Sequence, residues 1–401
     1  MKNFDSFSSA SRREFMRTLS LGLGATLVGS SALGGSLSWL EDASYGPASL
    51  EALQAGKQLG VALVGLGGYS AGQLAPALQQ TKLCKLAGIV TGTPTKAAKW
   101  KQQYQIPDQN IYDYKTFDRI ADNPAIDIIY IVLPVGLHAE YVERAARAGK
   151  HVICEKPMAT SVADCRRMIT AMQKAGKKFS IGYRLHFEPH NQEMMRLGQQ
   201  KVYGPIKTMK ADNGYHASNK SWRLDKELAG GGPLMDMGIY CVQGIVYTKG
   251  ELPVSVTAKF GPKTDPELFK EVESSINWQM QFADGAVADC RTSYAENMNS
   301  LLRADATKGW MELQPAYGYG GLDGRTSQGP MNIENVPQQA RQMDDFADCI
   351  LNNKPTRVPG EMGLRDMQII EAIYRAAQTG QKVSTKDVVA VLDKVSPKLK
   401  Q

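Results

Sequence analysis

The fold of this chain is decided by the stretch Leu59-Gly60-Val61-Ala62-Leu63-Val64-Gly65-Leu66-Gly67-Gly68-Tyr69-Ser70. An apolar, strand-like run leads into a glycine-rich turn, and a helical pattern follows the turn. Gly65, Gly67 and Gly68 let backbone N–H groups approach a phosphate at the positive end of that helix, and Ser70 keeps the third glycine position small. A glycine-rich turn without a ligand is the weaker interpretation, because a strand precedes the motif. The stretch therefore predicts a dinucleotide-binding unit.

Apolar runs alternate with amphipathic segments after this stretch, as is typical of βαβ units. We predict strands at 59–65, 85–90, 126–133, 151–154 and 178–183, with helices at 73–80, 95–104, 138–148 and 161–175. These elements predict an α/β fold whose N-terminal part is a Rossmann domain with a parallel sheet, over residues 59–183.

From Pro205 the pattern changes to the period-two alternation of a half-exposed sheet. We predict strands at 206–212, 254–260, 275–282 and 286–293, a helix at 238–247, and closing helices at 338–351 and 363–378. This pattern predicts a C-terminal α+β domain over residues 184–401, with a large, open, mostly antiparallel sheet. An open sheet needs a covering surface, so we also expect a homo-oligomer, either a dimer or a tetramer.

The N-terminus places two adjacent arginines before an uncharged stretch rich in glycine and serine. Ser11-Arg12-Arg13-Glu14-Phe15-Met16 precedes Leu19 to Leu33. This arrangement predicts a twin-arginine signal peptide over residues 1–35, export of the folded protein to the periplasm, and an N-terminal arm over 36–58. A membrane anchor is the weaker alternative, because a bilayer needs ~20 apolar residues. We therefore expect no stable membrane insertion.

The cysteines are dispersed and have no C-x-x-C spacing, and they lie mostly in apolar or helical stretches. They are Cys84, Cys154, Cys165, Cys241, Cys290 and Cys349. This pattern predicts buried thiols instead of a disulfide framework. It agrees with a protein that folds in the reducing cytoplasm before export. We predict no metal site.

Composition excludes one class of partner. The 401 residues are 43% hydrophobic, which is enough for a large core. The formal net charge of +7 is scattered, with no run of lysine and arginine and no interleaved aromatic residues. We therefore expect no nucleic-acid partner.

The end of the second predicted strand indicates which dinucleotide is bound. It reads Gly88-Ile89-Val90-Thr91-Gly92-Thr93-Pro94-Thr95-Lys96 and lacks the acid that usually binds the adenosine ribose of NAD. A hydroxyl at Thr91 and a cation at Lys96 suit an additional phosphate, so NADP is the predicted cofactor. The alternative is that Lys96 is an ordinary solvated lysine at a helix start.

Two further segments carry candidate chemistry. Lys156, in Glu155-Lys156-Pro157, follows a short strand and would lie at the carboxyl edge of the sheet, where such folds bind ligands. Asp236 and Tyr240 are four residues apart and would share one helix face. Taken alone, the first segment also suits a surface turn, and Asp236 and Tyr240 also suit an N-cap and a core aromatic residue.

Six segments of the chain match a known family. They are Ala62 to Gly67, Gly149 to Thr160, Gly182-Tyr183-Arg184, Trp222-Arg223-Leu224, Leu234 to Tyr240, and Pro359-Gly360-Glu361. Through them the chain, from Val61 to the last helix, resembles the glucose-fructose oxidoreductase/inositol dehydrogenase (Gfo/Idh/MocA) family, and most of all its periplasmic glucose-fructose oxidoreductases. The resemblance implies that Tyr240 takes the proton of a sugar hydroxyl, that Lys156 hydrogen-bonds the reacting oxygen, and that Asp236 orients the sugar. The cofactor-binding residues that we predict are Gly65, Gly67, Gly68, Tyr69, Thr91, Lys96, Leu133, Pro134, His138, Glu155, Lys156, Tyr183, Arg184, Trp222, Arg223 and Tyr319.

The same resemblance implies an NADP-dependent sugar oxidoreductase. It would oxidise an aldose at C1 to a lactone and reduce a second sugar by a ping-pong reaction with tightly bound NADP. One alternative is an aldose-aldose oxidoreductase, or a sugar 1-dehydrogenase that exchanges its cofactor. Another is an enzyme that cleaves glycosides through a keto-sugar intermediate. A binding module without catalysis is disfavoured, because Lys156, Asp236 and Tyr240 are all present.

Overall fold

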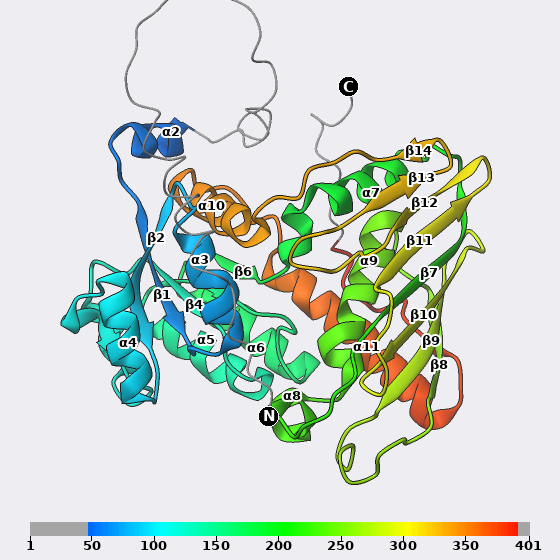
Figure 1. Cartoon of the computed structure of the whole chain (residues 1–401), viewed down its shortest axis with the longest axis horizontal. Helices are drawn as coiled ribbons and strands as arrows, with labels where there is room; N and C mark the ends of the chain where they lie inside the picture. The colour runs from blue at the N-terminus through cyan, green and yellow to red at the C-terminus, as the bar shows by residue number, and fades with distance from the viewer. Residues whose placement is uncertain (1–46, 392–401) are drawn as a thin grey trace, which may run out of the picture. The chain divides into compact units, whose positions relative to one another are not determined.

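The computed structural model describes residues 47–391, and Figure 1 shows a parallel sheet and a second, larger sheet with helices packed on them. The predicted signal peptide over 1–35 and the first part of the predicted arm lie outside the described residues.

The first sheet has six parallel strands in the order β3-β2-β1-β4-β5-β6. The strands are β1 (Leu59–Val64), β2 (Cys84–Val90), β3 (Ile111–Tyr112), β4 (Ile128–Ile131), β5 (His151–Cys154) and β6 (Phe179–Ile181). β1 pairs in parallel with β2 on one side and β4 on the other. This order is that of a Rossmann sheet, and the predicted α/β class is confirmed. β3 was not predicted, because two residues give no periodic signal.

The helix after the glycine-rich turn begins earlier than predicted. A π-helical turn, η2 (Ser70–Leu74), leads directly into α3 (Ala75–Leu78). The buried Ser70 hydroxyl donates to the carbonyl of Gly65 at 2.6 Å. This hydrogen bond links the first helical turn to the glycine-rich turn, three residues before the predicted helix start at residue 73. The other helices on this sheet are α4 (Pro94–Tyr104), α5 (His138–Arg147) and α6 (Val162–Lys174).

The second sheet has nine strands in the order β14-β13-β12-β11-β7-β10-β9-β8-β15. The strands are β7 (Ile206–Gly214), β8 (Ser255–Phe260), β9 (Ser275–Gln281), β10 (Val287–Ser293), β11 (Leu301–Ala306), β12 (Gly309–Leu313), β13 (Gly324–Thr326), β14 (Gly329–Pro330) and β15 (Val383–Ser384). β7 and β10 pair in parallel, whereas the other neighbours are antiparallel. The predicted mostly antiparallel sheet is confirmed, although the strands from β11 onward were not predicted.

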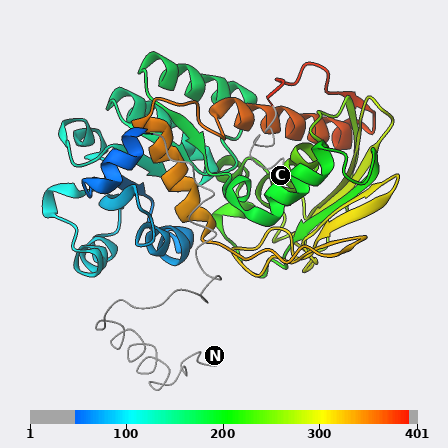
Figure 2. The ribbon, with the colours of Figure 1, turned by 90° about the horizontal axis from the view of Figure 1, so that it is seen from above.

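Several helices lie between the second sheet and the rest of the chain, as Figure 2 shows from above. They include α7 (Pro189–Gln199), α9 (Ile239–Lys249) and α11 (Gly360–Thr379), whereas the short α8 (Lys226–Ala229) packs beside the turn at Val135–Leu137. One continuous core joins Val64 and Ile129 of the first sheet, Met209 and Ile276 of the second, and Ile369 of α11. The two sheets are therefore held by shared apolar packing.

Helix α10 (Gln338–Leu351) packs on the first sheet, although its position in the sequence led us to expect it beside the second. Met343 and Phe346 of α10 lie in one cluster with Val61 and Leu63 of β1. The chain thus returns to the N-terminal sheet after completing most of the second sheet. The predicted boundary between Tyr183 and Arg184 stays a prediction.

The end of the predicted N-terminal arm forms a short helix, α2 (Pro47–Gln54). The N–H of Ala48 donates to Asn352 Oδ1 at 2.9 Å, and Asn352 Nδ2 donates to the Ser49 hydroxyl at 2.8 Å. Helix α2 is therefore fixed to the end of α10 by long-range polar contacts, which the sequence pattern does not reveal.

Candidate active site

A cleft of about 800 Å³ opens at the carboxyl ends of β1, β2, β4 and β5. Its other walls come from the start of α9, the segments after β7 and β10, and the loop after β12. Parallel α/β sheets bind their ligands at this edge.

All but two of the predicted site residues line this cleft. The predicted residues that line it are Gly65, Gly67, Gly68, Tyr69, Thr91, Lys96, Leu133, Pro134, Glu155, Lys156, Arg184, Trp222, Arg223, Asp236, Tyr240 and Tyr319. They come from both halves of the chain.

His138 and Tyr183 do not line the cleft, and their contact with the cofactor stays a prediction. His138 is 1% exposed. Its ring nitrogens lie 2.9 Å from the Leu133 carbonyl and 3.0 Å from the Pro157 carbonyl, so the ring joins the end of β4 to the loop after Lys156. Tyr183 is also buried and stacks on His186. The direction of both side chains is set by their buried neighbours, and their positions in the sequence do not determine it.

The glycine-rich turn has the shape that a dinucleotide requires. Gly65 has a φ of +93°, and a Cβ there would lie 2.5 Å from the Val132 carbonyl oxygen, so a side chain is excluded. Gly67 and Gly68 are exposed, and nothing lies within 4 Å of where their Cβ atoms would be. Open space beside exposed backbone at a helix start fits a pyrophosphate.

Thr91 and Lys96, which we predict to bind an additional phosphate on the ribose, both line the cleft. The N–H of Thr93 donates to the Thr91 hydroxyl at 3.2 Å, at the start of α4. The first turn of α4 holds no acidic residue, and Lys96 is exposed toward the cleft. The positive helix end and the lysine together favour an anion.

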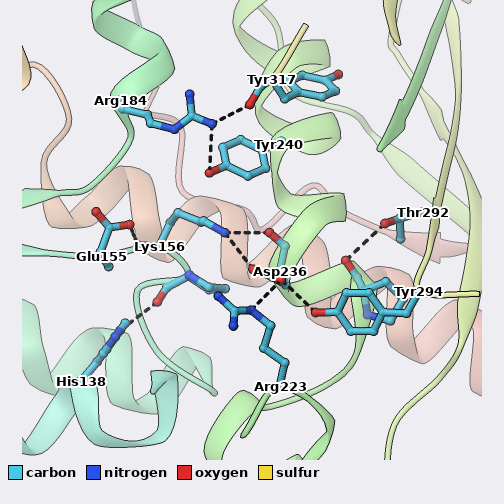
Figure 3. A network of polar contacts seen from close by, with 12 residues as sticks. His138, Glu155, Lys156, Arg184, Arg223, Asp236, Tyr240, Thr292, Tyr294 and Tyr317 are labelled. Atoms are coloured by element: carbon cyan, nitrogen blue, oxygen red, sulfur yellow. Dashed lines mark hydrogen bonds and ion pairs between the residues drawn. The ribbon is translucent and has the colours of Figure 1, made fainter. Parts of the chain in front are cut away.

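The catalytic candidates Lys156 and Asp236 form a partly buried ion pair (Figure 3). Lys156 Nζ donates to Asp236 Oδ1 at 3.0 Å and to the Asp236 carbonyl at 2.8 Å, and Arg223 Nε donates to Asp236 Oδ2 at 3.0 Å. Burial alone would raise the pKa of Asp236, but Lys156 and Arg223 outweigh burial and lower it to about 2. Burial lowers the pKa of Lys156, but Tyr240 and Asp236 raise it overall above its usual value. Both groups are therefore charged at neutral pH.

Tyr240 projects into the same space, between two cations. Lys156 Nζ lies 4.6 Å from the centre of its ring, and Arg184 Nη2 lies 3.4 Å from its hydroxyl (Figure 3). Arg184 is fixed by the carbonyls of Tyr317 at 2.6 Å and Gly318 at 2.8 Å. Both cations therefore lie within reach of a substrate hydroxyl placed beside the Tyr240 oxygen.

Asp236 and Tyr240 do not share an ordinary α-helix. The segment η8 (Leu234–Gly238) is a π-helical turn, and α9 begins after it. The spacing of four residues predicted one common helix face. Instead, the carboxylate of Asp236 meets Lys156 and Arg223, while the hydroxyl of Tyr240 is turned toward Arg184 (Figure 3).

Sequence reasoning missed four tyrosines of the cleft, Tyr114, Tyr215, Tyr294 and Tyr317. Tyr294 and Tyr215 come shortly after predicted strands, and that position was an available signal. Their juxtaposition depends on the parallel pairing of β7 with β10, which the sequence does not indicate. Tyr317 stacks on Tyr240 with ring centres 5.9 Å apart.

Within residues 47–391, no group of three or more histidine, cysteine or acidic residues could hold a metal ion. No helix in this part of the chain has the length and apolar character needed to cross a membrane.

A Rossmann sheet with an open glycine-rich turn, and a Lys–Asp–Tyr set beside it, defines a dinucleotide-dependent oxidoreductase. Three family models match the chain. They are described as an oxidoreductase family with an NAD-binding Rossmann fold (59–183), a GFO/IDH/MocA C-terminal domain (191–312), and an oxidoreductase family C-terminal alpha/beta domain (323–385). The chain belongs to the Gfo/Idh/MocA family of oxidoreductases.

The chain is similar to several characterised proteins. The crystal structure of an aldose-aldose oxidoreductase from Caulobacter crescentus, in complex with glycerol, is 45% identical, with a TM-score of 0.78 over 82% of this chain and 99% of that chain. A D-xylose 1-dehydrogenase [NADP(+)] from Haloarcula marismortui is 28% identical, over 80% of this chain and 92% of its own length. A D-glucoside 3-dehydrogenase from Escherichia coli is 26% identical, over 81% and 97%.

Proposed function

We propose that this protein is an NADP-dependent sugar oxidoreductase that oxidises an aldose at C1 and passes the reducing equivalents to a second sugar. The observation that carries the proposal is the Lys156–Asp236–Tyr240 set in the cleft beside the glycine-rich turn. Relatives named as an aldose-aldose oxidoreductase and an NADP-dependent xylose dehydrogenase support sugar chemistry. The 45% identity to the former favours an aldose, over fructose, as the second sugar.

The residues of this chain divide the work of the oxidation. Tyr240 takes up the proton of the C1 hydroxyl, and Lys156 donates a hydrogen bond to the reacting oxygen. Arg184 and Lys156 compensate negative charge on the Tyr240 oxygen from opposite sides. In the reduction of the second sugar, Tyr240 returns the proton to the new hydroxyl group.

The cofactor fits the glycine-rich turn and the start of α4. Gly65, Gly67 and Gly68 would hold the pyrophosphate, and Thr91 with Lys96 would hold the phosphate on the ribose. When bound, NADP supplies the group that accepts and returns a hydride.

We also propose that the protein is exported through the twin-arginine pathway and works in the periplasm with cofactor that it retains. All six cysteines are free and buried, as predicted, which suits folding in a reducing compartment. Free NADP is scarce outside the cytoplasm, so an exported enzyme of this kind gains from a second sugar that regenerates its cofactor. We further propose a homo-oligomer, because the nine-stranded sheet is open and exposes side chains such as Lys259 and Gln279, which a second copy of the chain would cover.

One experiment tests the proposal directly. The purified protein is denatured, any released nucleotide is identified by mass spectrometry, and the native protein is assayed with pairs of aldoses and ketoses. We expect NADP in the preparation, and lactone formation from one aldose when a second sugar is present without added cofactor. Turnover only after addition of NADP would reject the proposal that the protein retains its cofactor. Cleavage of aryl glycosides would favour the keto-sugar mechanism instead.

Lys96→Glu should reduce the preference of the protein for NADP over NAD. A charge-assisted contact with phosphate would be replaced by repulsion, so we expect NADP to bind at least about tenfold more weakly and NAD to bind as before. Both dissociation constants can be measured by fluorescence titration. Lys99→Glu, an exposed position on the same helix that does not line the cleft, is the control. An unchanged preference in Lys96→Glu would exclude Lys96 as the phosphate-binding residue.

A further inference from the structure

Two tyrosines lie side by side where β7 and β10, which are parallel neighbours in the second sheet, come to an end. Gly214 is paired with Ser293 in this register, and Tyr215 and Tyr294 are the next residues in each strand's path. The N–H of Tyr215 donates to the Ser293 carbonyl at 3.1 Å, and the two rings have centres 5.0 Å apart. Since parallel strands end at the same edge of a sheet, both tyrosines lie at that edge, and both line the cleft.

The phenol of Tyr294 reaches the catalytic carboxylate. Its hydroxyl donates to Asp236 Oδ2 at 2.9 Å, on the oxygen that also accepts from Arg223 (Figure 3). The other oxygen accepts from Lys156. Both oxygens of the carboxylate are thus engaged by donors from three separate parts of the chain, and the carboxylate cannot turn without losing one of them.

The groups that face Asp236 set its charge. They are the Lys156 ammonium, the Arg223 guanidinium and the phenols of Tyr294 and Tyr215. Burial, followed by the neighbouring Asp236, raises the pKa of Tyr294 well above its usual value. Tyr294 therefore keeps its proton and acts as a donor toward Asp236 at every pH at which the enzyme would work.

The ring of Tyr294 is held from behind by a small apolar cluster. Tyr294 is 0% exposed and packs with Leu224, Phe269 and Val272, of which the last two lie in the loop between β8 and β9. Thr292, two residues earlier, donates to the Asn213 carbonyl at 2.7 Å and fixes the strand end. This packing and the hydrogen bond of Thr292 direct the Tyr294 hydroxyl toward Asp236.

We propose that Tyr294 is a positioning residue, which fixes the Asp236 carboxylate and, through it, the Lys156 ammonium beside Tyr240. Tyr294 acts through Asp236 and has no role in proton transfer. The inference rests on the proposed function, because it assigns a role within the same site. A tyrosine that served only the packing of the core would contribute through its ring, and its hydroxyl would be dispensable.

The kinetic test is Tyr294→Phe, which keeps the ring and removes the hydroxyl. We expect kcat for aldose oxidation to fall about tenfold, as for the loss of a hydrogen bond to a charged group, with little change in the affinity for NADP. In an Asp236→Asn background, Tyr294→Phe should have almost no further effect, because the acceptor is already altered. Single-turnover reduction of bound NADP keeps these slow rates measurable.

Tyr374→Phe is the matched control, since the Tyr374 hydroxyl donates to the Glu273 carboxylate at 2.8 Å and does not line the cleft. It removes the same kind of bond, and we expect wild-type kcat. Equal kcat in Tyr294→Phe and wild type, or full additivity with Asp236→Asn, would overturn the proposal. A wild-type protein inactive on every sugar would instead reject the proposed function.

A second measurement does not depend on activity. Carbon-13 NMR titration of the Asp236 carboxyl group, assigned with Asp236→Asn, reports its pKa in the folded protein. Loss of the Tyr294 donor removes one of the interactions that lower this pKa to about 2, so we expect a rise in Tyr294→Phe. An unchanged pKa would show that Tyr294 does not hold the carboxylate.

Discussion

Tyr240→Phe is expected to lower kcat by roughly two to four orders of magnitude, the usual cost of losing a positioned acid–base group. The hydroxyl lies 3.4 Å from Arg184 Nη2, and Lys156 Nζ lies 4.6 Å from the ring centre, so the variant loses the oxygen that these cations serve. The ring itself is retained, and its stacking on Tyr317 at 5.9 Å should keep the local packing. NADP should bind as in the wild type, because the pyrophosphate and ribose sites are elsewhere in the cleft.

The measurement combines steady-state kinetics with the cofactor content of the purified variant. Tyr247→Phe is the control, because Tyr247 lies on the same helix, is buried, and directs its hydroxyl at Asn191 away from the cleft. A kcat for Tyr240→Phe close to that of Tyr247→Phe would remove Tyr240 as the group that takes up the proton. Loss of bound cofactor in the variant would instead indicate a wider disturbance of the cleft.

Lys156→Met is expected to lower kcat by roughly two to three orders of magnitude, as for the removal of one donor to a reacting oxygen. The ammonium has three protons, and two of its bonds are to Asp236, so one proton remains for the substrate oxygen. Methionine keeps the length of the apolar stem but supplies no donor and no charge. The variant should also show a higher pKa for Asp236, since Lys156 is the foremost of the groups that lower it.

Rates for Lys156→Met can be followed by single-turnover absorbance of the nicotinamide, and the pKa by the same carbon-13 titration. Lys150→Met provides the control, because Lys150 Nζ donates to the Asn123 carbonyl at 2.9 Å and does not line the cleft. Normal turnover by Lys156→Met would contradict the role of Lys156 as the donor to the reacting oxygen. A lowered rate in both variants would indicate general destabilisation.

The position of Lys156 could be predicted from the sequence, but its partners could not. A lysine directly after a buried strand lies at the carboxyl edge of a parallel sheet, and this consequence of local order holds in the structure. The contact with Asp236 joins residues 80 positions apart. No periodicity links two such distant segments, so their meeting depends on how the two sheets pack.

His138 and Tyr183 show that the position of a residue in the sequence does not determine the direction of its side chain. Both follow strands of the first sheet and were expected at the cofactor, yet both side chains are buried away from the cleft. Position along a strand places the backbone of a residue at the sheet edge. The direction of its side chain depends on which neighbours can hydrogen-bond with it or pack against it. Backbone carbonyls surround the ring of His138, and the ring of His186 stacks on that of Tyr183.

The stretch from Leu59 to Ser70 by itself determined the dinucleotide-binding turn, because strand, glycine-rich turn and helix start are encoded by neighbouring residues. Local patterns likewise determined the parallel first sheet and the mostly antiparallel second one. The tertiary structure alone decided that β7 and β10 run in parallel, that α10 returns to the first sheet, and that Tyr294 meets Asp236. These contacts join segments far apart in the chain, and their free energy comes from packing and buried polar pairing, which no local pattern records.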